Sequence, residues 1–388
     1  MVRRLTRALH ALDHAIGRAG GTRRILVELR TPVYQAVLRP VYETLLDLPY
    51  VDLQFTSEYP DVIRPLVGAE RFLTHGQAEW RRFDVYLNAD PWAAARLRRC
   101  AYRINFFHGV AGKYDLDDPR NLPLGYQYYD RVAFINRDRM TRYLEAGIVA
   151  PRQARLVGYP KLDRLALGRV SGAAVLAALG LRNGAPTVLY APTYSTASSL
   201  HLAGEAIVTG LAAAGLNVIV KLHDRSLDRD PRYTGGIDWR ARMRVLEQNP
   251  RVKFVEGPDS SPYLAAADAM VTDHSSVGFE YLVLDRPLFV FDAPNLASVA
   301  RINPEKIELL RSAATVVADV PSLVAAVRAG MADPSRLGMH RRRVAREMFH
   351  DPGNATSRAV ALVRELLEQR AAEPTVDVSA APARGGIS

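Results

Sequence analysis

The chain has 388 residues, of which 48% are hydrophobic and 24% are charged. This length predicts two to three domains, and the composition excludes disorder along the whole chain. The single cysteine excludes a disulfide scaffold and a cysteine-ligated metal cluster. The 51 basic and 41 acidic side chains leave a net charge of +10, which favours an anionic partner: nucleic acid, a membrane surface or a phosphorylated substrate.

The first 22 residues have the apolar periodicity of a helix, with Leu5, Leu9, Leu12 and Ile16 on one stripe. The arginines of this segment lie mostly off that stripe. We therefore expect a basic amphipathic helix over residues 1–22, which can lie on an anionic membrane or pack on its own domain.

From about residue 24 onward, short apolar runs alternate with helical stretches, as in βαβ units. In the first half the pattern predicts helices over 33–46 and 137–146, and strands over 51–55, 83–87, 103–107, 132–135 and 154–157. A Gly/Asn/Pro break follows at 182–186. After it the pattern predicts a helix from Pro321 and strands over 187–191, 218–222, 252–255, 269–272, 288–291 and 315–318.

The simplest architecture for this pattern is α/β, with two doubly wound, Rossmann-like domains facing each other across a cleft. We expect a first domain over 23–182, a second over 183–370, and a disordered tail over 371–388. Ligands of such folds lie beyond the carboxyl ends of the strands, so the residues that follow each strand are the candidates for a site.

In the first half, the expected strand over 103–107 leads into His108 and Gly109. A histidine there can accept a proton near neutral pH, and a glycine lets the backbone approach a ligand closely. A histidine bonded only to a neighbouring loop would give the same pattern.

In the second half, Thr193 follows one expected strand, and Lys221 and His223 share a face at the end of the next. Two potential cations on one face suit a phosphate. The alternatives are a simple helix cap at Thr193 and an ion pair between Lys221 and Asp224.

Another expected strand ends at Asp273, and Ser275 and Ser276 stand where a helix begins. Two hydroxyls at a helix N-terminus suit an anion, whereas a cap needs only one serine. Glu280, one turn further on, can accept hydrogen bonds from a ribose or from the neighbouring domain. The alternative is a capping arrangement without a ligand.

Other function classes lack their motifs. The sequence has no GxxxxGK[ST] loop, no GxGxxG fingerprint, no HExxH and no GxSxG elbow. Its basic residues are spread along the chain without interleaved aromatics, which disfavours a nucleic-acid partner. No resident metal or organic cofactor is expected.

Taken in order, the strand-end motifs resemble the CDP-glycerol glycerophosphotransferase family of teichoic-acid primases and polymerases. The resemblance covers about residues 100–292. It is carried by His108-Gly109, 158–163 (GYPKLD), 191–193 (APT), 221–223 (KLH), 272–276 (TDHSS), Phe279-Glu280 and 286–289 (RPLF). It implies a GT-B fold, with an acceptor-binding first domain and a nucleotide-binding second domain.

The resemblance also implies a reaction, in which an acceptor hydroxyl attacks the distal phosphorus of a CDP-alditol and CMP leaves. Glycerol phosphate is the first candidate for the transferred group, and the acceptor would be lipid-linked or a glycan. The enzyme would act in cell-envelope synthesis, peripherally at the cytoplasmic face of the membrane.

Residue roles follow from the same resemblance. His108 would deprotonate the acceptor, and His223 would steady the pyrophosphate. The substrate-binding set would be Gly109, Thr193, Lys221, Asp273, Ser275, Ser276, Glu280 and Arg358.

The sequence departs from the family pattern at Asp224, where the family usually has proline, and at Glu280, where aspartate is commoner. Two other functions stay open: a GT-B glycosyltransferase that uses a UDP- or GDP-sugar, and a non-catalytic nucleotide-binding protein of envelope assembly.

Overall fold

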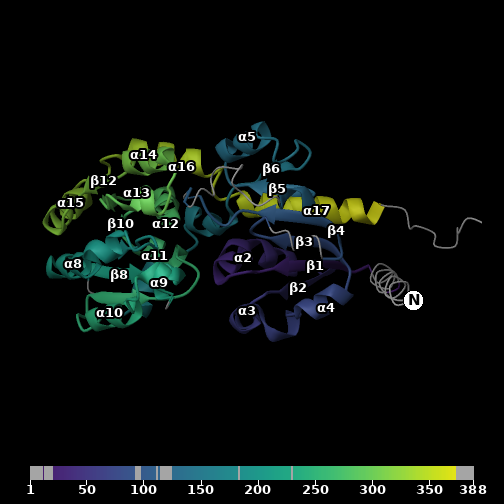
Figure 1. The fold of residues 1–388 in the computed structure, drawn as a ribbon, viewed down its shortest axis with the longest axis horizontal. Helices are drawn as coiled ribbons and strands as arrows, with labels where there is room; N and C mark the ends of the chain where they lie inside the picture. Colours follow the sequence, from purple (N-terminus) through teal and green to yellow (C-terminus); the bar gives the residue numbers. More distant parts are fainter. Residues whose placement is uncertain are drawn as a thin grey trace, which may run out of the picture.

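The computed structural model describes residues 12, 21–91, 98–110, 112–113, 125–181, 184–228 and 230–372. Two six-stranded parallel sheets dominate this part of the chain, one built by each half of the sequence (Figure 1). The expected amphipathic helix over 1–22 and the expected tail over 371–388 fall almost entirely outside the described residues. None of the described helices is long and apolar enough to cross a membrane.

The first sheet has the strand order β2-β1-β3-β4-β5-β6. Its strands are β1 (Arg23–Glu28), β2 (Val51–Thr56), β3 (Phe83–Asn88), β4 (Cys100–Phe106), β5 (Arg131–Phe134) and β6 (Ala154–Leu156). The five strands predicted in this half are confirmed to within a few residues. The pattern missed β1, whose apolar core is short and whose last residue, Glu28, is charged. Glu28 is nevertheless buried, because Arg98 binds its carboxylate at 2.6 Å.

The second sheet has the order β12-β11-β10-β7-β8-β9. All six of its strands agree with the prediction: β7 (Thr187–Tyr190), β8 (Asn217–Lys221), β9 (Val252–Val255), β10 (Ala269–Thr272), β11 (Leu288–Phe291) and β12 (Thr315–Val317). The residues of β7, β8, β10 and β11 are all buried, as in a sheet covered by helices on both faces.

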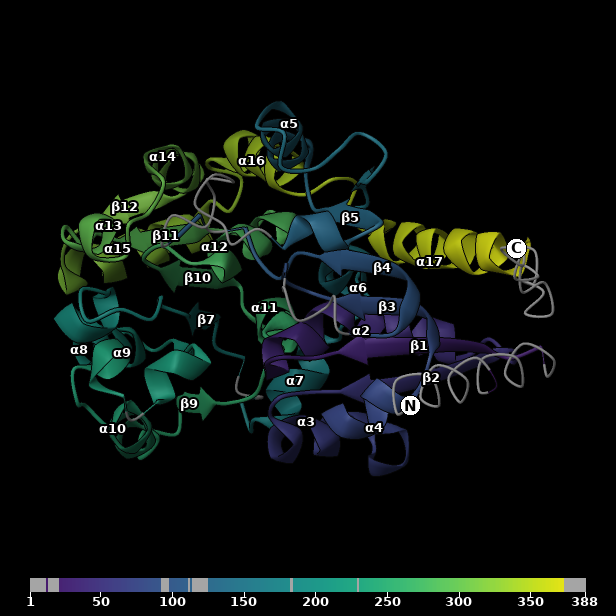
Figure 2. The ribbon, with the colours of Figure 1, turned by 45° about the vertical axis from the view of Figure 1, so that its right-hand side comes forward.

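Helices connect the strands and cover the sheets (Figures 1 and 2). In the first half they are α2 (Pro32–Leu46), α3 (Pro60–Val67), α4 (His75–Trp80), α5 (Arg137–Glu145), α6 (Asp163–Ala166) and α7 (Gly172–Ala178). In the second half they are α8 (Ser199–Ala213), α9 (Pro231–Thr234), α10 (Trp239–Leu246), α11 (Ser261–Ala266), α12 (Ser276–Tyr281), α13 (Leu296–Val299), α14 (Pro304–Ser312), α15 (Val320–Ala332) and α16 (Gly338–Met348).

The last helix, α17 (Ala355–Ala372), returns to the first sheet although it follows the second in the chain. Figure 1 shows it in yellow alongside β4 and β5. Its buried side chains, among them Val363 and Leu366, belong to the same hydrophobic cluster as Ile25 and Val85 of the first sheet. The two-part division at residue 183 stays a prediction, but the chain crosses between the sheets a second time before α17.

Candidate active site

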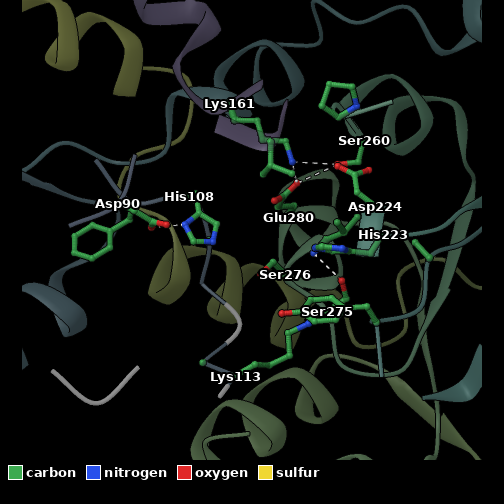
Figure 3. A pocket seen from close by; sticks show the side chains of 18 of the residues that line it. Asp90, His108, Lys113, Lys161, His223, Asp224, Ser260, Ser275, Ser276 and Glu280 are labelled. Atoms are coloured by element: carbon green, nitrogen blue, oxygen red, sulfur yellow. Dashed lines mark hydrogen bonds and ion pairs between the residues drawn. The ribbon is translucent and has the colours of Figure 1, made fainter. Parts of the chain in front are cut away.

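A cavity of about 400 Å³ lies where the carboxyl ends of the two sheets meet. That size suits a small-molecule ligand. Both halves of the chain line it, and the side chains around it are drawn in Figure 3. Seven of the ten residues proposed from the sequence line this cavity: His108, Gly109, Lys221, His223, Ser275, Ser276 and Glu280.

His108 stands two residues beyond β4 and is bound to a carboxylate. Its Nδ1 atom lies 2.6 Å from Oδ1 of Asp90. Enclosure by the protein lowers the pKa of His108, but the Asp90 carboxylate outweighs that effect and raises the pKa above its ordinary value. With Nδ1 occupied by Asp90, the Nε2 atom is left to exchange a proton with a ligand.

The sequence interpretation missed Asp90. It stands two residues past β3, and β3 and β4 are neighbours whose register pairs Asn88 with Asn105. Because parallel neighbours deliver their following loops to the same edge, Asp90 and His108 meet. The signal available in the sequence was therefore an acid at the same distance past the adjacent strand.

The backbone around His108 is held by first-half side chains. The Tyr159 hydroxyl donates to the His108 carbonyl oxygen at 2.8 Å, and Arg139 donates to that of Gly109 at 2.8 Å. A Cβ atom built on Gly109 would lie 3.3 Å from Oγ of Ser276. Gly109 therefore permits the close approach of the two halves on either side of the cavity.

His223 faces the cavity from the carboxyl end of β8, at the start of a short 3₁₀ helix, η6 (Asp224–Leu227). Its Nδ1 atom accepts the backbone N–H of Arg225 at 3.1 Å, so in the neutral ring the proton is on Nε2. Burial, with the nearby charges of Lys113 and Lys221, holds the pKa of His223 well below its usual value. His223 is thus a neutral hydrogen-bond donor at pH 7.

Two lysines bring positive charge to the same region. Lys221 ends β8 and donates to the Leu222 carbonyl oxygen at 2.8 Å. Lys113, from the first half, donates to the Thr193 hydroxyl and lies 4.9 Å from the centre of the Tyr194 ring. Burial lowers the pKa of Lys113 to about 8. Lys113 was not among the residues proposed from the sequence, although it stands only five positions after His108.

Ser275 and Ser276 stand at the start of α12, on the opposite side of the cavity from Asp90 and His108 (Figure 3). Ser275 is the N-cap, and its hydroxyl accepts the Val277 N–H at 3.4 Å. Ser276 is the first residue of the helix and also lines the cavity. The structure therefore uses one serine as a cap, and the second is placed toward the cavity.

Glu280 binds the neighbouring half of the chain. Its Oε2 atom accepts from Lys161 Nζ at 2.7 Å and from the Ser260 hydroxyl at 3.4 Å. Lys161 lies on a 3₁₀ helix, η5 (Pro160–Leu162), just after β6. The sequence left two partners open for Glu280, a ribose or the neighbouring domain. The structure shows a contact with the neighbouring half of the chain, because Glu280 of α12 pairs with Lys161 of the 158–163 motif.

Thr193 and Asp273 lie behind the cavity wall. The buried Asp273 carboxylate accepts the backbone N–H groups of Thr193 and Ser199, at 2.8 and 2.9 Å, and the Ser199 hydroxyl at 3.0 Å. It also accepts its neighbour's N–H, that of His274. Asp273 thus shapes the turns after β7 and β10, and it does not line the cavity.

Arg358 also lies away from the cavity, at the start of α17. Its guanidinium donates to the carbonyl oxygens of Val157, His350 and Asp351 and to the Asp351 carboxylate, at 2.6–3.3 Å. Arg358 thus joins the turn at residues 350–351 to the end of β6, and the structure places its guanidinium outside the cavity, away from the phosphate contact expected for it.

Among the residues that the structure describes, no group of three or more His, Cys, Asp or Glu side chains is placed to hold a metal ion. The cavity offers instead a histidine–carboxylate pair on one side and N–H, O–H and ammonium donors on the other. This set can take a proton from one reactant and stabilise negative charge on another.

Solved structures of other proteins share the two-sheet architecture of this chain. The wall teichoic acid polymerase TagF superposes with a TM-score of 0.65 at 16% identity, over 95% of each chain. MnaA of S. aureus, solved with UDP, superposes with a TM-score of 0.58 at 14% identity, over 91% of this chain and 99% of the other. The UDP-GlcNAc 2-epimerase of Neisseria meningitidis, bound to UDP-GlcNAc, gives 0.58 at 11%, over 89% and 100%. These likenesses confirm the expected GT-B architecture.

Comparison with curated proteins gives no match. The family comparison is specific: the profile of the CDP-glycerol:poly(glycerophosphate) glycerophosphotransferase family matches residues 117–365, more than half of the chain. The matched segment includes all the second-half motifs, from 191–193 to 286–289, and the start of α17. The chain therefore belongs to the CDP-glycerol:poly(glycerophosphate) glycerophosphotransferase family and is a transferase.

Proposed function

We propose that the chain transfers glycerol phosphate from CDP-glycerol to an acceptor hydroxyl held near His108, and that CMP is released. The observation that carries this proposal is the placement of the Asp90–His108 pair across one cavity from His223, Ser275 and Ser276. TagF, which shares the fold, has been solved with CDPG.

In the proposed reaction, His108 Nε2 takes the proton of the acceptor hydroxyl. The acceptor oxygen forms a bond to the phosphorus that carries glycerol, and the bond from that phosphorus to the oxygen bridging to CMP breaks. CMP leaves with the electron pair. Asp90 orients the His108 ring and stabilises the imidazolium that forms.

The second half of the chain, together with Lys113 of the first half, would hold the pyrophosphate. Neutral His223 donates from Nε2, and Lys113 and Lys221 supply positive charge. Ser276 adds a hydroxyl and, with Ser275, backbone N–H groups at the start of α12. Phosphoryl transfer needs chiefly positioning and charge stabilisation, which these groups can supply. Glu280 and Thr193 would act on the site indirectly, because Glu280 holds Lys161 at the cavity wall and the Thr193 hydroxyl accepts a hydrogen bond from Lys113.

The test is CMP release. Purified protein is incubated with CDP-glycerol and a lipid-linked or glycan acceptor, and CMP is quantified. His108→Ala should lower kcat by about 10²- to 10⁴-fold with the affinity for CDP-glycerol nearly unchanged. The matched control is His340→Ala, an exposed histidine on α16 outside the cavity. Full turnover by His108→Ala would show that His108 is not the base.

The two alternatives give different results. A sugar-nucleotide glycosyltransferase would be stabilised against heat more by UDP or GDP conjugates than by CDP-glycerol or CMP. A non-catalytic assembly protein would bind CDP-glycerol yet release no CMP with any acceptor. Thermal-shift profiles with the three nucleotide classes, followed by the CMP assay, separate all three functions.

We further propose that the enzyme acts peripherally at the cytoplasmic face of the membrane, on a membrane-borne acceptor. The support is the basic amphipathic pattern of residues 1–22. Deletion of 1–22 should abolish co-sedimentation with vesicles containing anionic lipid and leave CMP release onto a water-soluble acceptor intact. Equal sedimentation of both forms would refute the membrane role of this segment.

A further inference from the structure

Asp224 places a carboxylate in a cavity whose neighbouring groups otherwise suit phosphate. It is the first residue of η6, directly after His223, and it lines the cavity together with Lys221 and Ser260. Figure 3 shows it on the second-sheet side, near His223 and Glu280. An acid at this point is unfavourable for pyrophosphate binding unless it faces another part of the ligand.

Among the residues that the structure describes, none is a hydrogen-bond or ion-pair partner of the Asp224 carboxylate. Within the described part of the chain, its oxygens accept no hydrogen bond and lie within 4.0 Å of no Lys, Arg or His nitrogen. Lys221, the nearby cation, donates to the Leu222 carbonyl oxygen instead. Partial burial raises the pKa of Asp224 despite the Lys221 charge. Because no described group of the protein binds its oxygens, the carboxylate keeps its accepting capacity for a ligand.

The other carboxylate on this side of the cavity, that of Glu280, is nearly enclosed, and one of its two oxygens is already engaged. Oε2 of Glu280 already accepts from Lys161 and Ser260, and the side chain is 3% exposed. Asp224 is therefore the better placed of the two to accept two hydrogen bonds at once from neighbouring hydroxyls. Carboxylates take vicinal diols in this way, as acidic residues do with ribose hydroxyls in dinucleotide-binding folds.

We propose that Asp224 is a specificity-determining residue that accepts hydrogen bonds from a vicinal diol of the CDP-glycerol donor. The inference rests on the proposed function. CDP-glycerol carries two such diols, the 2′,3′-diol of the ribose and the 2,3-diol of the glycerol end. In either case Asp224 selects a hydroxylated ligand and faces away from the phosphates.

The test measures Kd by calorimetry for three ligands: CDP-glycerol, its 2′-deoxyribose analogue, and the n-propyl ester of CDP, which lacks the glycerol diol. Native protein should bind one analogue about 10- to 100-fold more weakly than CDP-glycerol, and that analogue identifies the diol. Asp224→Ala should weaken CDP-glycerol binding by a similar factor and abolish the discrimination. Asp224→Asn, which keeps one accepting oxygen, should be intermediate.

The matched control is Asp228→Ala, an exposed acid four residues further on and outside the cavity. The proposal is overturned if Asp224→Ala binds all three ligands as tightly as native protein or more tightly, since the carboxylate would then only repel phosphate. Should Asp224→Ala fail to fold, Asp224→Asn decides by the same criterion. Absence of CMP release by the native enzyme would instead refute the proposed function.

Discussion

Lys161 and Glu280 form a buried ion pair between the two halves of the chain: Lys161 Nζ lies 2.7 Å from Glu280 Oε2, and the two side chains are 6% and 3% exposed. Lys161 follows the last strand of the first sheet, and Glu280 belongs to α12 at the edge of the second. Both side chains also line the cavity. The contact therefore joins the two sheets at the wall of the proposed active site.

Removal of one partner of this pair should be costly. Lys161→Met leaves the Glu280 carboxylate buried without its cation and should lower the free energy of unfolding by about 3–5 kcal/mol in urea denaturation. Lys161→Met combined with Glu280→Leu should recover most of that loss. The control is Arg39→Ala, which breaks a pair of the same 2.7 Å length whose side chains are nearly half exposed, and which should cost about 0–1 kcal/mol. Equal losses at the two sites would contradict the interpretation.

Replacement of Asp90 should change the pH dependence of the reaction as well as its rate. The Asp90 carboxylate raises the pKa of His108, and a base must be neutral, so the acid limb of kcat/KM in the native enzyme should lie above the ordinary histidine pKa. Asp90→Asn removes the negative charge that raises the pKa of His108, while enclosure and the Arg139 charge still lower it, so this limb should move to lower pH and the plateau rate should fall about 10²-fold or more. If the acid limb, measured from pH 5 to 9, stayed at the same pH in Asp90→Asn, Asp90 would not be the group that raises the pKa of the base.

Lys113 should make the affinity for CDP-glycerol fall at alkaline pH. Its pKa is lowered to about 8, so the side chain is cationic below that pH and progressively neutral above it. The affinity for CDP-glycerol should therefore decline from pH 7 to 9.5. Lys113→Arg, which stays charged, should remove the decline, and Lys113→Met should bind weakly at every pH. If the native decline persists in Lys113→Arg, another group is responsible.

Asp163 should stabilise the return of α17 to the first sheet. Its buried carboxylate accepts the backbone N–H groups of Gly353, Ala355 and Thr356. Asp163→Ala leaves these donors without partners at a helix start and should lower the free energy of unfolding by about 1–3 kcal/mol. Thermal unfolding checks this, and a Tm within 1 °C of native would rule out the role.

Replacement of Arg358 should lower the stability of the protein and leave its affinity for CDP-glycerol unchanged. Arg358→Ala removes contacts to Val157, His350 and Asp351, so the Tm should fall. The Kd for CDP-glycerol should stay within about twofold of native, because the guanidinium does not line the cavity. A large increase in Kd without a loss of Tm would restore the phosphate contact that the sequence suggested.

The sequence by itself determined the succession of elements and most of the cavity. Largely apolar runs of four or five residues between helical stretches predict eleven of the twelve observed strands, because parallel strands covered on both faces are nearly continuous apolar segments. Residues directly after these strands, such as His108, His223 and Ser275, line the cavity because the carboxyl ends of both sheets meet there.

Only the tertiary structure decided which polar side chains meet. Asp90 reaches His108, and Lys161 reaches Glu280 from 119 residues away, because neighbouring strands and facing sheets bring distant loops together. The family resemblance assigns Asp273 and Arg358 to the same substrate-binding set as the cavity residues, yet the hydrogen bonds of Asp273 hold the turns after β7 and β10, and those of Arg358 hold the return of α17 to the first sheet. Local patterns fix where a strand ends and which residue follows it; the partner of a buried charge depends on strand order and the packing of the two sheets.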